Sequence, residues 1–138
     1  MDTETRSYRT GAEETVLDLT RDAEQYVADM GDGLLHVFVP HATAGIAIIE
    51  TGAGSDDDLL AALRSVLPPG GPSGSGWTHR HGSPGHGRDH VLPGLVPPYA
   101  SLPVVGGRLA LGTWQSLVLV DTNVDNPVRS VRFSYLAG

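Results

Sequence analysis

LPVVGGRLALGTWQSLVLVD, which spans residues 102–121, is the stretch of this chain that decides the fold. Its runs of valine and leucine are divided by the Gly106-Gly107 turn and by Gly112, which interrupts the apolar alternation. We expect strands at residues 101–105, 108–112 and 114–121. Short strands joined by glycine turns favour a largely β architecture.

The composition supports one β-rich domain. A chain of 138 residues with 40% hydrophobic and 18% charged residues forms one domain, here residues 1–138, with a sizeable core. Its 18 glycines and 10 prolines favour strands and turns over a helical bundle. The net charge of -7 argues against a nucleic acid or an anionic membrane as partner, although a small phosphorylated ligand needs only a local basic pocket. The N-terminus lacks the pattern of a secretory signal, so we expect a cytoplasmic protein.

Two helices are expected before the long loop. Apolar residues from Ala23 to Met30 follow helical spacing, with Thr20 as the expected N-cap. Ser55 with Asp58 resembles a capping box at the start of the second helix, which ends before Pro68.

The remaining strands follow from shorter apolar runs. Residues 34–40 and 43–50 are apolar on both faces, which predicts buried strands. Residues 7–19 predict one or two strands with a turn at Gly11, and residues 128–135 predict the last. If the runs at 34–40 and 43–50 pair as a hairpin, Glu50 lies far from His41 along the sheet.

Histidine is the residue that points to chemistry. His79, His81, His86 and His90 lie within WTHRHGSPGHGRDH, residues 77–90, and His41 follows a predicted strand. Neutral imidazole is the commonest metal ligand and a common general acid or base. Because the chain has no cysteine, any metal must be held by His, Asp or Glu. The pattern predicts a histidine-based metal or catalytic site, with a merely polar loop as the alternative.

Other residues carry weaker signals. His36 lies within a predicted strand, where we expect a buried, hydrogen-bonded structural histidine. Arg108 beside the double-glycine turn suits a phosphate or carboxylate, and the alternative is an exposed arginine on an ordinary hairpin with Trp114 in the core. Residues 68–87 have the composition of a linker, but a long loop inside one domain is more often functional.

Several motifs resemble those of one family. HATAGIAIIE resembles the H-T-S/T-A-x-x-x-I-N-E segment of the YjbQ-like proteins, uncharacterised protein family 0047. WTH and DHV are similar to that family's aromatic-x-His and S-H-I/L/V elements. The stretch quoted first closely resembles its I-P-V-x-x-G-R-L-x-L-G-T-W-Q-x-I-x-L-x-E motif. The resemblance covers nearly the whole chain.

The resemblance implies an α+β fold, an antiparallel β-sandwich of about eight strands with two flanking helices, assembled as a homotrimer. It implies a divalent-metal site near the subunit interface, with zinc as the expected ion, whose ligands are His41, His79 and His90. It gives no role to His81 and His86. Its other site residues are Glu50 and Gln115 as catalytic candidates and Arg108, Thr113 and Trp114 as ligand-binding candidates. Three histidine ligands leave a position open for water or substrate.

The family label implies a secondary thiamine-phosphate synthase, which joins a hydroxymethylpyrimidine diphosphate to a thiazole phosphate with loss of pyrophosphate. This chain departs from the pattern at Ile49, where the family has Asn, and at Leu92, where it has a basic residue. The acidic loop between the second and third histidines is replaced by HGSPGHGRD. Two alternatives stay open: a non-catalytic protein that binds a metal or a small phosphorylated ligand, and a structural trimer.

Overall fold

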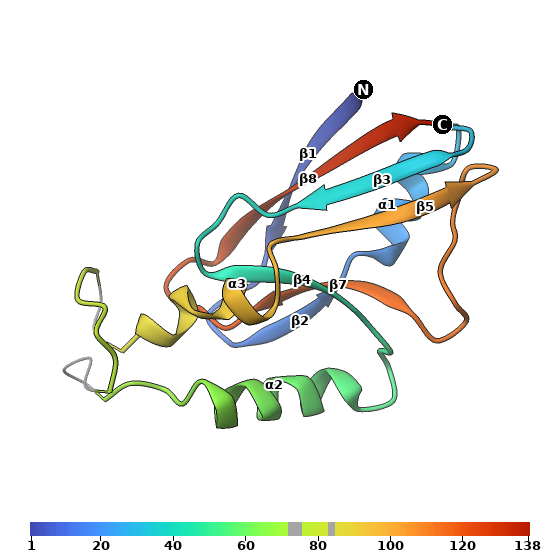
Figure 1. Cartoon of the computed structure of the whole chain (residues 1–138). Coiled ribbons are helices and arrows are strands. Elements are labelled where there is room, and N and C mark those ends of the chain that lie inside the picture. Colours follow the sequence, from blue (N-terminus) through green and yellow to red (C-terminus); the bar gives the residue numbers. More distant parts are fainter. Residues whose placement is uncertain (72–75, 83–84) are drawn as a thin grey trace.

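Eight strands form two antiparallel sheets in the computed structural model of the chain, which describes residues 1–71, 76–82 and 85–138 (Figure 1). The larger sheet has the order β1-β8-β3-β5-β6 and the smaller one the order β2-β7-β4. The strands of the larger sheet are β1 (Asp2–Arg9), β8 (Val128–Ala137), β3 (Gly33–Phe38), β5 (Tyr99–Val105) and β6 (Arg108–Leu109). Those of the smaller sheet are β2 (Thr15–Asp18), β7 (Ser116–Asp121) and β4 (Ala44–Ile49). The predicted α+β sandwich is confirmed.

The main core lies between the two sheets. Alternate residues of β3 and β7, such as Leu35, Val37, Leu117 and Leu119, are buried there together with the apolar face of α1 (Thr20–Val27). This period-two burial is what strands with one face against a core require.

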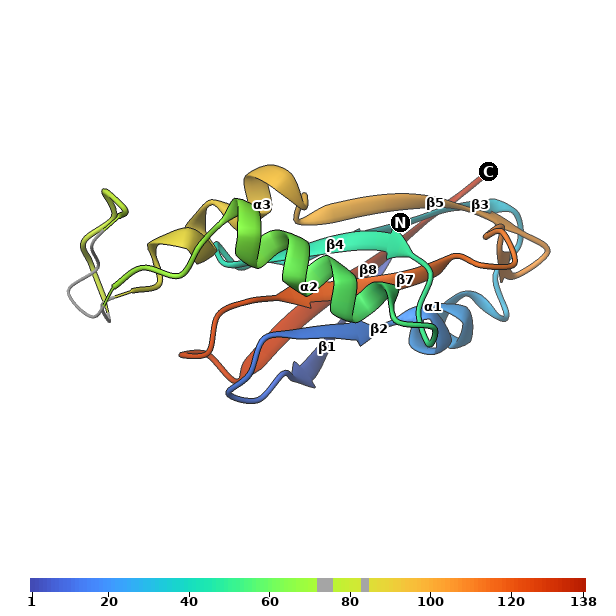
Figure 2. The ribbon, with the colours of Figure 1, turned by 90° about the horizontal axis from the view of Figure 1, so that it is seen from below.

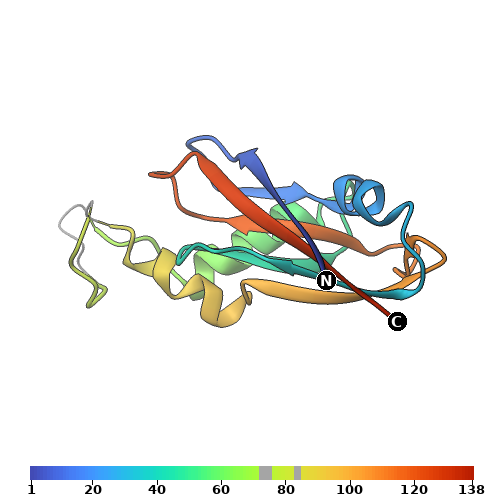
Figure 3. The same ribbon diagram turned by 90° about the horizontal axis from the view of Figure 1, so that it is seen from above.

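Helix α2 (Ser55–Val66) covers the outer face of the smaller sheet (Figure 2). Leu63 and Leu67 pack there against Val118 and Val120 of β7. The short helix α3 (Leu92–Leu95) joins the same cluster through Leu92, which is fully buried. Viewed from the opposite side, the strands of the larger sheet lie in front of α2 (Figure 3). The sequence did not predict α3, because Pro93 and Gly94 are poor helix formers and burial of Leu92 is a tertiary effect.

The two strands that flank His41 do not form a hairpin. β3 lies between β8 and β5 in the larger sheet, whereas β4 pairs with β7 in the smaller one. Residues 39–43 therefore cross from one sheet to the other. In the β4–β7 pair, Ala44 lies opposite Asp121 at one end and Ile49 opposite Ser116 at the other. Glu50 does lie far from His41, as expected. The two residues are separated along β4 of the smaller sheet, however, and not along a hairpin of β3 and β4.

The predicted helix starts are right and their caps are wrong. The N-cap of α1 is Leu19, and Thr20 instead donates its backbone N–H to Asp18 Oδ1 at 2.9 Å. The N-cap of α2 is Gly54 at φ 107°, with no side-chain cap hydrogen bond, so the Ser55–Asp58 capping box does not form. A left-handed φ favours glycine, which supplies this turn without a side-chain cap.

His36 is hydrogen-bonded as expected, through Nδ1 to Ser101 Oγ at 2.8 Å, but it is exposed and stacks on Tyr99. Its position in β3 faces away from the core side that carries Leu35 and Val37. Within the described part of the chain, no helix has the length and apolar character needed to cross a membrane.

Candidate metal centre

Four histidines gather at one end of the molecule. The ring centroid of His79 lies 4.1 Å from that of His81, 5.2 Å from that of His86 and 4.1 Å from that of His90. His79 and His81 come from the loop after α2, and His90 comes from the 3₁₀ helix η1 (Gly87–His90). We call these four residues the histidine cluster. The histidine pattern predicted a site in this loop, and the family resemblance selected His79 and His90 of these four; the structure brings all four together.

The donor atoms of the cluster suit a metal ion. One ring nitrogen from each of His79, His81 and His86 lies within 4.8 Å of the others. The donor nitrogens of two imidazoles that bind one zinc ion lie no more than about 4.2 Å apart, because each Zn–N bond is about 2.0–2.1 Å. Only a small side-chain adjustment separates the two arrangements. His79 Nε2 is buried and has no hydrogen-bond partner among the described residues, which is uncommon unless a ligand completes the site.

The electrostatics of the cluster favour the neutral forms of His79 and His90. Burial lowers the pKa of His79, and the positive charge that His90, His81 and His86 would carry lowers it further. Burial also lowers the pKa of His90, with His86 and His81 acting in the same direction. A metal ion binds the deprotonated ring nitrogen, so these shifts prepare the ligands for a cation.

Gly87 lets the histidine loop approach η1. A Cβ atom built on Gly87 would lie 2.7 Å from Cβ of Trp77 and 3.3 Å from Cβ of His79. Trp77 is itself held by its indole N–H, which donates to the carbonyl of Pro68 at 3.0 Å. The absence of a side chain at residue 87 therefore positions His79 against η1.

Asp89 anchors η1 to the end of β7. Its Oδ1 accepts from Thr122 Oγ1 at 2.6 Å, and its Oδ2 accepts from Asn123 Nδ2 at 3.3 Å. Burial raises the pKa of Asp89, and the hydrogen bond from Thr122 opposes that shift. The adjacent His90 is thus fixed at the Asp121 end of the smaller sheet.

A carboxylate also holds His86. Asp125 Oδ2 lies 3.1 Å from Nδ1 of His86. Histidines that bind metals commonly donate their second ring N–H to a carboxylate, which fixes the tautomer and makes the other nitrogen more basic. With Nδ1 at Asp125, His86 would bind a metal through Nε2. Asp125 was not predicted, since nothing in DNPV marks it as a partner of a histidine 39 residues earlier.

His41 lies at the same end of the smaller sheet but outside the cluster. Its Nε2 accepts the backbone N–H of Ser130 at 2.9 Å, and it makes no ring contact with the four histidines within the described residues. Burial lowers the pKa of His41, and the nearby charge of Arg129 lowers it further. In this conformation Nδ1 is the nitrogen that His41 has available.

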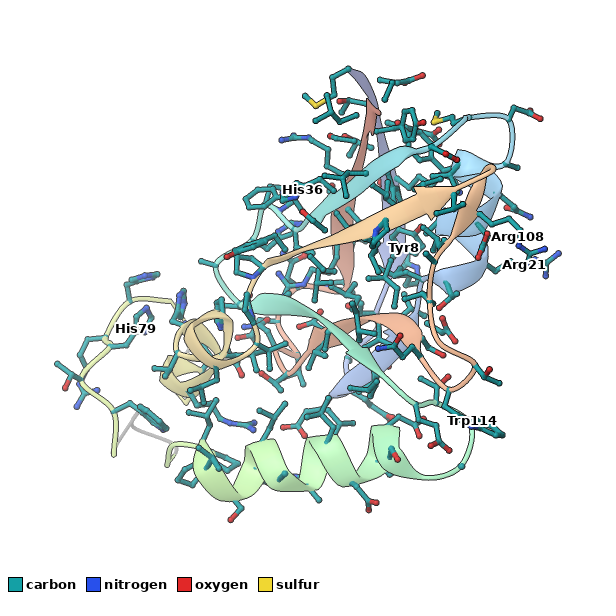
Figure 4. All side chains as sticks on the ribbon, turned by 45° about the vertical axis from the view of Figure 1, so that its right-hand side comes forward. Tyr8, Arg21, His36, His79, Arg108 and Trp114 are labelled. Atoms are coloured by element: carbon teal, nitrogen blue, oxygen red, sulfur yellow. The ribbon has the colours of Figure 1, made fainter. Side chains whose placement is uncertain are left out.

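The other predicted site residues lie at the opposite end. Glu50 follows β4 and Gln115 precedes β7, next to the Ile49–Ser116 pair. Gln115 Oε1 accepts the backbone N–H of Gly112 at 2.7 Å. In Figure 4, Trp114 and Arg108 lie on one side of the molecule and His79 on the other. Thr113 and Arg108 are exposed, and Trp114 is 75% exposed, so the alternative of a core tryptophan is wrong.

The chain matches known proteins over nearly its full length. The family model described as UPF0047 protein YjbQ-like matches residues 4–137. The UPF0047 protein Rv2556c of Mycobacterium tuberculosis is 52% identical over 138 residues, which is 100% of both chains. The UPF0047 protein YugU of Bacillus subtilis is 32% identical over 120 residues, which is 82% of this chain and 83% of YugU.

Solved structures of similar proteins have the same fold. The hypothetical protein APE1520 of Aeropyrum pernix K1 superposes with a TM-score of 0.82 at 31% identity, covering 100% of both chains. A YbjQ-like protein of unknown function, SSO2532 of Sulfolobus solfataricus P2, gives a TM-score of 0.84 over 99% of this chain and 97% of its own, which at 23% identity shows the fold alone. The relatives named above carry no substrate or metal in their names.

Proposed function

The chain belongs to the UPF0047 YjbQ-like family, and from that premise we propose that its histidine cluster binds a divalent metal ion, with zinc as the expected ion. The observation that carries the proposal is the meeting of three histidine donors around His79, whose Nε2 is buried without a partner among the described residues. Protonated imidazoles would repel one another at these distances, whereas a cation stabilises their neutral forms.

Two ligand sets are compatible with this proposal, and His79 belongs to both. The donor distances within this chain support His79, His81 and His86. The family resemblance implies His41, His79 and His90, and His90 supports that set by stacking on His79 at 4.1 Å. The second set requires His41 to bind through Nδ1 or to give up its hydrogen bond from Ser130.

Metal content separates the two sets. Purified protein is loaded with zinc, dialysed and measured by mass spectrometry for bound metal, together with alanine variants at each of the five histidines. His36→Ala is the matched control, because His36 is exposed and bonds Ser101 outside the cluster. Loss in the variants of His81 and His86 supports the first set, and loss in those of His41 and His90 supports the second. Full metal content in His79→Ala would overturn the proposal.

We propose further that the protein is a homotrimer. In this trimer the end of one chain that carries Glu50 and Gln115 lies against the histidine cluster of the neighbouring chain. Five residue steps of β4 separate Ala44 from Ile49, about 17 Å at 3.3 Å per residue, so Glu50 and Gln115 cannot reach the cluster of their own chain. A neighbouring subunit can supply these residues. The outer face of the larger sheet supports association, since it exposes apolar side chains of three strands: Leu34, Tyr99, Val105 and Leu136.

Light scattering on the purified protein tests the trimer. We expect three times the 14.5 kDa mass of one chain. Leu34→Asp, at the centre of the apolar face, is expected to shift the protein toward monomers, whereas Val66→Asp, exposed on α2, leaves the mass unchanged. A monomeric wild-type protein would exclude a shared site.

The finer proposal is that the trimer is a thiamine-phosphate synthase, on the strength of the family resemblance. A bound divalent metal would supply Lewis acidity toward a phosphate oxygen. Glu50 and Gln115 would orient the substrate, and Arg108, Thr113 and Trp114 would bind it. Release of pyrophosphate from the two thiamine precursors is the measurement. Metal-loaded trimer that releases none is a metal-binding protein without this activity, and trimer that binds no metal is a structural one.

A further inference from the structure

A cavity of about 300 Å³ lies beside the histidine cluster and has His86 in its wall. The rest of the wall includes Glu14, Arg88, Thr122, Val124 and Asp125. The volume lies at the lower end of the range found for small-molecule sites, about 300–1,000 Å³. Most of the side chains in the wall are polar or charged, and they come from segments that are far apart in the sequence.

Arg88 is the unusual residue of this wall. Its side chain is only 5% exposed. Nε donates to the carbonyl of Leu67 at 2.6 Å, and Nη1 donates to Glu14 Oε1 at 2.5 Å. Nη2 is buried and has no hydrogen-bond partner among the described residues. A buried guanidinium nitrogen without an acceptor is costly, so an acceptor from outside the chain would stabilise it.

Glu14, the carboxylate bonded to Arg88, is shared with a second arginine. Glu14 divides its carboxylate between Arg88 and Arg64, whose Nη2 lies 2.6 Å from Glu14 Oε2. Two guanidinium groups therefore share one carboxylate. Asp89, whose pKa is raised by burial and lowered by the charge of Arg88, is a second acid of the wall near Arg88, but it makes no hydrogen bond to Nη2.

The other acids of the wall are already engaged within the protein. Asp89 accepts from Thr122 and Asn123, and Asp125 contacts His86. Among the described residues of the wall, the group that lacks a partner is thus Nη2 of Arg88, a positively charged donor. A negatively charged acceptor is its best partner.

We propose that this cavity binds a small organic oxyanion, with a carboxylate or phosphate oxygen accepting from Nη2 of Arg88. Arginine suits both groups because its planar fork matches their oxygens. The position beside His86 places the rest of such a ligand next to the histidine cluster. The site stands on Arg88 and the cavity and does not depend on a bound metal.

Calorimetric titration tests the proposal with two probes, inorganic phosphate and glycolate, at constant ionic strength set with sodium chloride. Wild-type protein is measured as purified and after treatment with EDTA. We expect saturable binding of at least one probe in both preparations, and the tighter probe identifies the anionic group. Absence of binding by both probes, or binding that disappears with EDTA, would overturn the proposal.

The matched pair Arg88→Gln and Arg64→Gln locates the anion. Both substitutions remove one charge that bonds Glu14, but Arg64 is half-exposed and does not line the cavity. We expect Arg88→Gln to weaken binding at least about tenfold, as loss of a charge-assisted hydrogen bond does, and Arg64→Gln to leave it within about twofold. Equal weakening in the two variants would indicate general charge attraction and sink the proposal.

Val124→Trp covers the case in which Arg88→Gln fails to fold. Val124 is 50% exposed and lines the cavity, so a larger side chain there fills the space without removing any contact of Arg88. We expect a folded protein, verified by circular dichroism, that no longer binds the probe. Undiminished binding would place the anion elsewhere.

Discussion

Asp125 Oδ2 lies 3.1 Å from Nδ1 of His86, which orients one imidazole of the histidine cluster from outside it. Under the proposed function, Asp125→Ala leaves every histidine in place but releases His86. Loss of such a supporting carboxylate typically weakens metal affinity by about 10- to 100-fold. We expect a weakening in that range, measured by competition for zinc with a chromogenic chelator.

The control for that measurement is Asp57→Ala, which removes an exposed carboxylate from the first turn of α2. Its zinc affinity should equal that of the wild type. If both variants weaken binding alike, the effect comes from the overall charge and not from the orientation of His86.

Gly87 offers a second way to disturb the site without removing a ligand. A Cβ atom at this position would lie 2.7 Å from Cβ of Trp77, so Gly87→Ala should push the loop that carries His79 and His81 away from η1. We expect weaker zinc binding by the same competition assay. Gly94→Ala is the control, because a Cβ atom there has no heavy atom within 4 Å. Zinc binding by Gly87→Ala at wild-type strength would show that the loop adapts.

Much of the fold was predictable because its signals are local. The apolar runs predicted five strands close to their observed bounds (β3, β4, β5, β7 and β8), and helical spacing predicted α1 and α2. The prediction for residues 7–19 missed the first half of β1, and the one for residues 108–112 made β6 too long. What failed was set by distant partners. β3 and β4 share a connection of five residues but pair in different sheets, since β8 and β5 flank β3 whereas β7 binds β4. No local pattern in the sequence specifies such pairing.

The candidate site was likewise predictable where its signals are local and not where distant residues meet. Composition identified the histidine loop, but the family resemblance left His81 and His86 without a role, and they lie beside His79. Their approach depends on Gly87 packing against Trp77, a contact between two residues ten apart in the sequence that no local pattern marks. The burial of Arg88 was equally hidden, because charged residues are rarely buried unless paired and its partner Glu14 lies 74 residues earlier.

Asp121 and Arg129 form a buried ion pair whose disruption should be costly. Their side chains are 0% and 1% exposed, and the guanidinium donates to both carboxylate oxygens, at 2.7 and 2.8 Å. Asp121→Asn leaves the charge of Arg129 buried without its counter-ion, which destabilises a protein by about 3–5 kcal/mol. We expect a loss in that range from urea unfolding.

The exposed pair of Arg6 and Glu4 supplies the comparison for this ion pair. Glu4 is nearly half exposed, and Glu4→Gln should cost no more than about 1 kcal/mol, because water screens surface pairs. Equal losses from Asp121→Asn and Glu4→Gln would contradict the role assigned to burial.

Glu14 should give the stability of the protein a defined dependence on pH. Burial alone would raise its pKa, but the hydrogen bonds from Arg88 and Arg64 outweigh burial and lower it. An acid whose pKa is lowered by folding contributes stability above its unfolded pKa, about 4.3, and loses that contribution as pH falls through the folded value. Glu14→Gln should therefore be less stable than the wild type at pH 7, with the difference shrinking below about pH 4.

Urea midpoints measured from pH 3 to 8 test this expectation, with Glu13→Gln as the control for loss of one exposed negative charge. A difference that stays constant down to pH 3 would show that Glu14 contributes through packing and not through its charge.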